Sequence, residues 1–203
     1  METPEQLYES LMSVVRDRLD AVAVLAASQG AAFARAEAAA FHGRKIVEGI
    51  AFGCLVATEQ GRKQVPRDAK GQWNAKVILN RLASKNIETF PSPSILRKAN
   101  DSERRSGGVA LVVEGQPDRR VTHQELVAIY QRLHRWLHEL NPYVSKDRMA
   151  FCEQHEASLW DDLARVERLM ERHFIAIAGR GFFCILRDSV DSRTKVVSLE
   201  EVS

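Results

Sequence analysis

Residues 32–60 read AFARAEAAAFHGRKIVEGIAFGCLVATEQ, and this stretch decides how the chain folds. Apolar and small side chains recur along it at the spacing of one helical face, which predicts a single long helix. Its glycines, Gly43, Gly49 and Gly53, each cost about 1 kcal/mol relative to alanine inside a helix. Tight packing against neighbouring helices offsets that cost, because small residues let two backbones approach closely. We therefore expect this helix to form the centre of the core.

Further helices are predicted on both sides of the central one. Thr3 and Gln6 form a capping box with a proline between them, and Thr122 and Glu125 form a second capping box. Apolar residues follow each box at helical spacing, which marks both as helix starts. The predicted helices lie at residues 4–28, 32–60, 73–84, 122–141 and 147–173.

Strand signals are fewer and are concentrated at the end of the chain. β-Branched residues predict a short strand over residues 109–113, and the hydrophobic period changes after residue 173. The segments 174–178 and 182–186 flank a glycine-rich turn and indicate a β-hairpin, to which residues 194–199 can add a strand. The prolines at 91 and 93 predict a loop over residues 86–93, and the polar residues 101–108 predict an exposed segment.

These elements predict a mainly α fold, a helical bundle with a small C-terminal antiparallel β-hairpin or meander. One domain is expected over residues 1–203, with the bundle in residues 1–173 and the β appendage in residues 174–203. A chain of 203 residues is long enough to bury a substantial core.

The composition favours a cytoplasmic protein without a membrane anchor. Hydrophobic residues make up 45% and charged residues 28%, and the net charge of +2 is too small to indicate nucleic-acid binding by itself. The chain starts without the pattern of a signal peptide, and no apolar run is long enough to span a bilayer. The three cysteines form no Cys-x-x-Cys pair, which predicts reduced thiols and neither a disulfide framework nor structural zinc.

Candidate functional residues are densest in residues 130–143, which read YQRLHRWLHELNPY. His134 and His138 are one helical turn apart and share a helix face. Two histidines at this spacing could hold a metal ion, but the segment lacks the glutamate of a zinc-protease helix and fixes no further carboxylate ligand. We therefore expect no metal and interpret the pair as a polar face, either at a contact or in a site for acid–base chemistry.

Arg132 and His138 form an Arg-x5-His pattern that resembles the motif of the HEPN superfamily, small helical-bundle proteins common in toxin–antitoxin and phage-defence systems. Active members have an arginine, four to six residues and a histidine, usually with a polar residue directly after the arginine, where this chain has Leu133. The segments 40–59 and 129–143 are also similar to uncharacterised bacterial HEPN-like proteins with an Arg-Lys-x-x-Glu helix, a Leu-His-x-x-Asn-Pro helix end and a C-terminal hairpin. A competing match, Arg-x4-His, occurs at Arg168 to His173.

The resemblance implies a metal-independent endoribonuclease that acts as a homodimer without a cofactor. Arg132 would bind the scissile phosphate and His138 would be the acid–base residue, because histidine titrates near neutrality. RNA would be the substrate, and a protein encoded in the same operon would be a partner in a conflict or stress response. The alternative is a non-catalytic HEPN-like interaction or sensing module, so catalysis is left open.

The spacing of the two catalytic candidates bears on the dimer. Six residues turn a helix by about 120° from the starting direction, so Arg132 and His138 could meet only across two subunits.

Arg44 and Glu48 are one turn apart, and they form either an ion pair beside the core or, through Arg44, part of an anion site near His138. Asn141 ends the helix before a proline and could hold His138 by a hydrogen bond.

Overall fold

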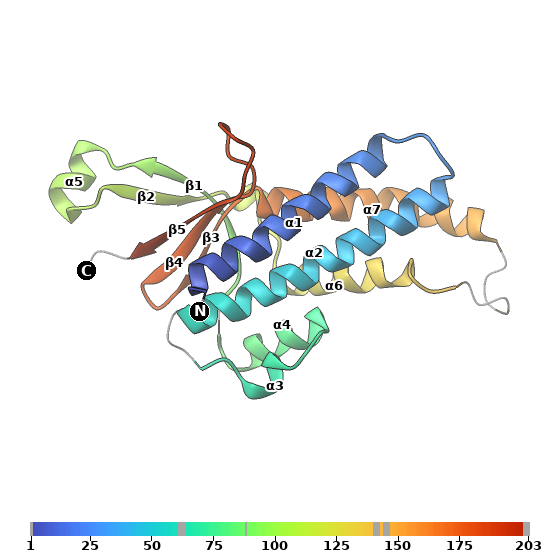
Figure 1. Ribbon diagram of the computed structural model, residues 1–203, viewed down its shortest axis with the longest axis horizontal. Coiled ribbons are helices and arrows are strands. Elements are labelled where there is room, and N and C mark those ends of the chain that lie inside the picture. The colour runs from blue at the N-terminus through green and yellow to red at the C-terminus, as the bar shows by residue number, and fades with distance from the viewer. Residues whose placement is uncertain (1, 61–63, 88, 140–142, 144–146, 201–203) are drawn as a thin grey trace.

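Four long helices pack together in the molecule, and a five-stranded sheet lies toward one end of them (Figure 1). This computed structural model describes residues 2–60, 64–87, 89–139, 143 and 147–200. The long helices are α1 (Pro4–Ala27), α2 (Ala32–Gln60), α6 (His123–Arg135) and α7 (Arg148–Met170). The shorter helices are α3 (Arg67–Lys70), α4 (Ala75–Ser84), α5 (Asp101–Gly107) and the 3-10 turn η1 (Pro117–Arg119).

Helix α2 is the centre of the core, as the sequence predicts. It contacts α1, α4, α6, α7 and strands β3 (Arg172–Ile177) and β4 (Arg180–Ile185). Its small residues lie where neighbours approach most closely. A Cβ atom added at Gly43 would come within 2.4 Å of the Leu163 side chain of α7, and one at Gly53 within 3.0 Å of the Tyr8 ring of α1. Only a small residue leaves room for these contacts.

Both predicted capping boxes are present. The Gln6 amide donates to the Thr3 hydroxyl over 3.2 Å, and the Thr3 amide donates to the Gln6 side chain over 2.9 Å. Thr122 and Glu125 make the same pair of bonds at the start of α6. These bonds satisfy amides that have no partner inside a helix. Helix α6 ends at Arg135, earlier than predicted, and the predicted end at Asn141 lies outside the described residues.

The sheet is antiparallel throughout, in the order β2-β1-β3-β4-β5. Strands β3 and β4 form the predicted hairpin, and β5 (Lys195–Glu200) is the predicted third strand. Two further strands come from the middle of the chain: β2 (Leu111–Gly115), which overlaps the strand predicted over residues 109–113, and β1 (Ser92–Lys98), for which the sequence predicts no strand. Strand β1 pairs with β3 only through residues 92 and 93 and with β2 from residue 94 onward, and it therefore links the two hairpins of a curled sheet.

The prediction of a helical bundle with a small C-terminal hairpin is wrong, because the five-stranded sheet is a substantial part of the fold. The physical reason lies in β1, which the sequence predicts to be partly loop. Pro93 has no N–H to donate, which argues against a central strand. At this position the missing N–H breaks no hydrogen bond to β2, because the ladder between β1 and β2 starts only at Ser94. The Pro93 carbonyl still accepts a hydrogen bond from the Gln116 amide over 2.7 Å.

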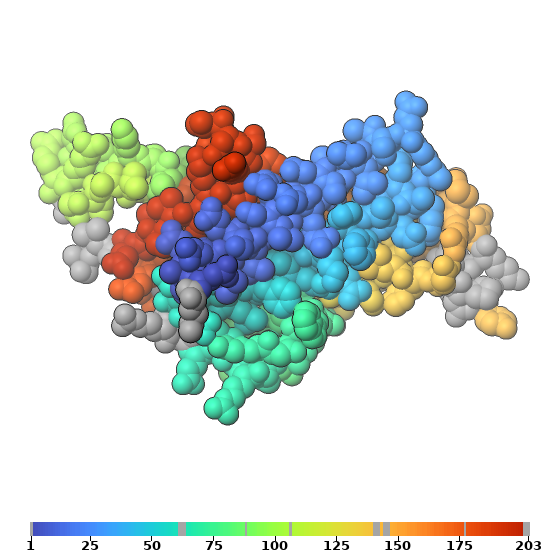
Figure 2. All heavy atoms as spheres, in the orientation of Figure 1, coloured from blue at the N-terminus to red at the C-terminus, as the bar shows by residue number. Residues whose placement is uncertain are grey.

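The polar segment 101–108, predicted as an exposed segment, contains helix α5. Asn100 and Glu103 form a third capping box, and Gly108 ends the helix with a left-handed φ of 61°, which glycine adopts without steric cost. Figure 2 shows the arm formed by β1, α5 and β2 projecting at one end of the molecule, far from the end of α6. Among the described helices, none combines the length and apolar character needed to cross a bilayer.

Candidate functional site

The candidate site is built around the last turn of α6 and the residues that follow it. Leu126, Ile129 and Leu133 are buried and hold α6 against the core. After Arg135 the chain makes a tighter turn, in which the Leu137 amide donates to the His134 carbonyl. This turn brings His138 back toward His134, with 2.9 Å between their Nε2 atoms and 4.3 Å between the ring centroids. The predicted histidine pair is thus in contact.

Helix α2 adds an arginine to this pair. Gly43 packs against Leu133 of α6, and the next residue, Arg44, reaches the site from the α2 side. Its Nη1 lies 2.8 Å from Nδ1 of His134, and its guanidinium carbon lies 5.4 Å from the centre of the Tyr130 ring. The close approach of two helices at a glycine therefore places the arginine beside the histidines.

Glu48 anchors the arginine from one turn along α2. Its side chain is 9% exposed. It accepts hydrogen bonds from Nε of Arg44 over 3.1 Å, from Nζ of Lys45 over 2.8 Å and from the Tyr130 hydroxyl over 3.2 Å. A buried carboxylate with two cationic partners and a hydroxyl donor is well compensated. Of the two predicted roles for Arg44 and Glu48, the ion pair is present, and it lies next to the histidines.

The arginine determines how protons are arranged on the two rings. A guanidinium only donates, so Nδ1 of His134 accepts the bond from Arg44. The neutral His134 ring then carries its hydrogen on Nε2 and donates it to Nε2 of His138. Partial burial, Arg44 and His138 all lower the pKa of His134 below its usual value. His134 is therefore neutral at pH 7, and the chain of hydrogen bonds runs from Arg44 through His134 to His138.

Exposure differs along this chain of hydrogen bonds. His138 is exposed, His134 is half-buried, and the Arg44 side chain is 28% exposed. A solute can therefore reach His138 and the edge of the guanidinium. A titratable imidazole next to a fixed cation is suited to moving a proton near a bound anion. Within the described part of the chain, no three His, Cys, Asp or Glu side chains are grouped so that they could hold a metal ion.

Arg132 lies apart from this cluster. Its Nε and Nη2 atoms each donate to an Asp162 carboxylate oxygen over 2.7 Å, which makes a two-point ion pair between α6 and α7. Asp162 is 5% exposed. The structure thus brings Arg44, Glu48, His134 and His138 together and directs Arg132 to α7. Convergence of Arg132 with His138 across a dimer stays a prediction, and Asn141 lies outside the described residues.

Two functional contacts are absent from the sequence-based prediction. Tyr130 is buried on α6, and its hydroxyl donates a hydrogen bond to Glu48. Its position one turn before His134 is a signal that could have revealed it. Asp162 gives no local signal, because its partner Arg132 is 30 residues away. The other Arg-x-x-x-x-His match ends at His173, which is fully buried and accepts a hydrogen bond from Tyr8.

Comparisons with known proteins add no further constraint on the site. No protein-family model, no curated protein and no solved structure matches the chain.

Proposed function

We propose that the protein is a metal-independent endoribonuclease, HEPN-like in its chemistry, with Arg44, His134 and His138 as its reaction site. The observation that supports this proposal is the chain of hydrogen bonds from Arg44 to His134 (2.8 Å) and from His134 to His138 (2.9 Å) at an exposed helix end. It places a cation and an imidazole that can accept a proton within reach of one phosphodiester. A role in bacterial conflict or stress response is part of the proposal.

The proposed reaction uses the 2′-hydroxyl of RNA as the nucleophile. This hydroxyl would take the place of the His134 N–H as the donor to Nε2 of His138. As the 2′-oxygen bonds to phosphorus, its proton passes to His138, and the bond to the 5′-oxygen breaks. The 5′-oxygen takes a proton from water as it leaves, and His138 then returns its proton to the solvent. The products are a 2′,3′-cyclic phosphate and a 5′-hydroxyl. His138 is the general base in this scheme.

Arg44 and His134 would stabilise the charge that develops on the phosphate. The guanidinium edge can donate to the non-bridging oxygens, and the Nε2–H of His134 becomes free to do the same when substrate displaces it from His138. Glu48 would be a positioning residue, since its bonds to Arg44 and Tyr130 fix the guanidinium. Arg44 thus takes the phosphate-binding role that the sequence pattern assigns to Arg132.

The test is cleavage of labelled RNA by the purified protein in the presence of EDTA. The wild type should give 2′,3′-cyclic phosphate ends, and His138→Ala should reduce the rate about 100-fold or more, the usual contribution of a general acid or base. His155→Ala is the matched control, because His155 lies on α7 against Phe151, outside the cluster. Growth arrest on induced expression of the wild type but not of His138→Ala would support the conflict role.

The alternative is a non-catalytic interaction or sensing module. It is favoured by the pairing of both candidate arginines, Arg44 with Glu48 and Arg132 with Asp162, which offsets the charge that would attract a phosphate. If the wild type and His138→Ala fold equally well and neither cleaves RNA, the ribonuclease proposal is rejected and this alternative takes its place.

A further inference from the structure

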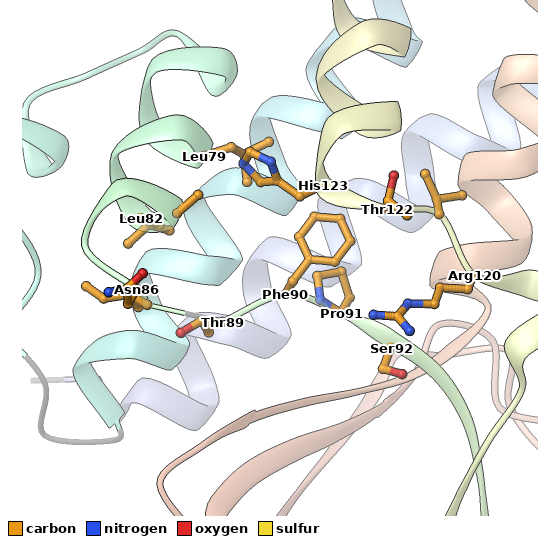
Figure 3. A pocket seen from close by; sticks show the side chains of 13 residues that line it. Leu79, Leu82, Asn86, Thr89, Phe90, Pro91, Ser92, Arg120, Thr122 and His123 are labelled. Carbon is orange, nitrogen blue, oxygen red and sulfur yellow. The ribbon is translucent and has the colours of Figure 1, made fainter.

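A cavity of about 460 Å³ lies at the other end of α6 from the histidine pair (Figure 3). It is open to solvent on one side and is lined by α4, by residues 89–92 at the start of β1 and by residues 120–123 at the start of α6. His123, its nearest histidine, is eleven residues from His134, which is about 16 Å along a helix. The volume falls within the range of small-molecule sites in proteins. The cavity is thus separate from the proposed ribonuclease site.

One wall of the cavity is apolar and partly aromatic. Leu79 and Leu82 of α4 are almost fully buried, and the half-buried Phe90 ring meets the His123 ring edge-on with 6.2 Å between centroids. Figure 3 shows Phe90 between the α4 leucines and the start of α6. A flat apolar group placed against this wall would leave water and gain contact with an aromatic face.

The side of the cavity formed by residues 120–123 has polar groups that lack a partner among the described residues. Nε2 of His123 is buried and makes no hydrogen bond with the described residues, which is rare for a buried polar atom. The Arg120 guanidinium extends toward Pro91 and Ser92 in Figure 3 and forms no hydrogen bond or ion pair with another described side chain. The adjacent Arg119, by contrast, binds Glu171 over 2.6 Å.

The start of α6 adds to the positive character of this wall. The first amides of a helix have no partner within it and carry the positive end of its dipole. Glu125 is the acidic residue in the first turn of α6. Its charge is compensated, because it accepts hydrogen bonds from the amide and hydroxyl of Thr122 and from Arg165. Glu125 would therefore repel an anion near Arg120 only weakly.

We infer that this cavity binds a small anionic molecule with a planar apolar body. Arg120 would bind the anionic group, since a guanidinium matches a carboxylate or phosphate with two parallel hydrogen bonds. Phe90, the His123 ring beside it and the α4 leucines would cover the planar body. Aromatic carboxylates and mononucleotides both have this chemistry.

The test is a titration of the purified full chain with benzoate, adenosine 5′-monophosphate and inorganic phosphate, followed by calorimetry and by the NMR signals of the His123 ring. At least one of the two probes with a planar body should bind saturably and shift those signals, and should bind more tightly than inorganic phosphate. Tighter binding of benzoate would indicate an aromatic carboxylate as the ligand, and tighter binding of adenosine 5′-monophosphate would indicate a mononucleotide.

Two neighbouring arginines make a matched pair for this titration. Arg120→Gln should weaken binding about tenfold or more, as expected for the loss of a charge-assisted hydrogen bond. Arg119→Gln should leave binding unchanged, because Arg119 faces Glu171. Arg120 is exposed, so its variant should unfold at the same urea concentration as the wild type. Absence of saturable binding, equal weakening by both variants, or equal affinity for inorganic phosphate would overturn the inference.

Discussion

Arg44 and Arg132 contact α6 from different directions, and their partners determine what each can do. Arg132 directs two of its nitrogen atoms to Asp162, and its position on α6 turns it toward α7. Arg44 divides its donors between Glu48 and His134. A phosphate can compete for a guanidinium edge next to a neutral imidazole more easily than for an edge held at two points by a carboxylate. At the residue scale, this difference makes Arg44 the candidate for binding a phosphate and Arg132 a structural residue.

The first prediction concerns the Arg132–Asp162 pair. Arg132→Ala leaves a carboxylate that is 5% exposed without its cation, which costs about 3–5 kcal/mol when a pair is fully buried. The Arg132 side chain is 40% exposed, so water compensates part of this loss, and we expect a loss of roughly 2 kcal/mol. Urea denaturation should show the decrease in the free energy of unfolding.

Arg132→Lys and His138→Ala serve as comparisons for this prediction. Lysine keeps the charge but cannot make the two-point contact, so its variant should fall between the wild type and Arg132→Ala. His138→Ala should leave the free energy of unfolding nearly unchanged, because His138 is exposed. An Arg132→Ala protein of normal stability that no longer cleaves RNA would instead restore Arg132 to the catalytic role predicted from the sequence.

The second prediction is a loss of stability at acidic pH caused by His173. This residue is fully buried, accepts a hydrogen bond from the Tyr8 hydroxyl over 2.7 Å and contacts the Met170 carbonyl through Nδ1 over 3.0 Å. Burial lowers the pKa of His173 from 6.5 to about 4. Its neutral form is therefore favoured by folding, and its contribution to stability is complete above pH 6.5 and is lost as the pH falls toward 4.

The size of this effect follows from the two pKa values. A difference between 6.5 and about 4 corresponds to roughly 3 kcal/mol at low pH. Denaturation of the wild type and of His173→Gln at pH 7.5 and pH 4.5 should give a smaller pH effect for the variant. NMR titration of the wild-type ring checks the same quantity directly, and a His173 pKa near 6.5 would contradict the prediction.

At the scale of single elements, the third prediction tests the packing of α2. Gly43→Ala places a Cβ atom 2.4 Å from Leu163 and 3.2 Å from Leu133, both of them buried. Overpacking costs about 1–3 kcal/mol, which exceeds the gain of about 1 kcal/mol in helix propensity. We expect a net loss of roughly 1 kcal/mol, measured by urea denaturation.

Gly107→Ala is the matched control for this substitution. Gly107 also lies in a helix, α5, but its added Cβ atom meets only Val109 at 3.7 Å, an ordinary contact. This variant should be as stable as the wild type or slightly more stable. If Gly43→Ala is stabilised to the same degree, close helix packing is not the reason for the glycine in α2.

The elements that could be predicted from the sequence are those with strong local signals. Helix α2 has a continuous helical period, and α1 and α6 begin with capping boxes. Strand β1 gives no such signal, because a proline interrupts it and only Ile95 and Leu96 are adjacent apolar residues. It is a strand because β2 and β3 provide partners from distant parts of the chain. Pairing of this kind is a tertiary effect that local propensity does not contain.

The contacts of the candidate site also divide into local ones, which the sequence predicts, and long-range ones, which it does not. The contact between His134 and His138 and the pair formed by Arg44 and Glu48 are local, one helical turn apart, and the sequence predicts both. The bond between Arg44 and His134 joins residues 90 positions apart, and the one between Arg132 and Asp162 joins residues 30 apart. Both depend on how α2 and α7 pack against α6. Sequence spacing therefore identified most members of the site but not how its arginines divide between partners.

At the scale of the whole molecule, the two candidate sites and the sheet occupy different places. The histidine pair lies at the end of α6, the cavity beside Arg120 lies at its beginning, and the β1–α5–β2 arm projects at the far side of the sheet (Figures 1 and 2). The histidine pair can therefore be altered without direct contact with the cavity. The remaining question at this scale is whether one chain is sufficient for a complete ribonuclease site.

The fourth prediction answers that question by mixing inactive variants. In the proposed site, Arg44 and His138 act within one chain, so a mixture of Arg44→Ala and His138→Ala proteins should remain as inactive as its components. A site shared between subunits behaves differently. Half of the randomly mixed dimers then contain both variants, and one of the two sites in each is intact, so about a quarter of wild-type cleavage should return.

A mixture of Arg132→Ala and His138→Ala proteins tests the site shared between subunits that the Arg-x5-His pattern implies. If Arg132 of one subunit meets His138 of another, Arg132→Ala alone should be inactive, and mixing it with His138→Ala should restore about a quarter of the cleavage. If Arg132 is structural, folded Arg132→Ala should cleave RNA by itself. Light scattering at the assay concentration should accompany both mixtures, because restoration requires dimers that exchange subunits. Recovery in the Arg44 mixture would contradict a single-chain site, since Arg44 and His134 are joined within one chain by a 2.8 Å contact.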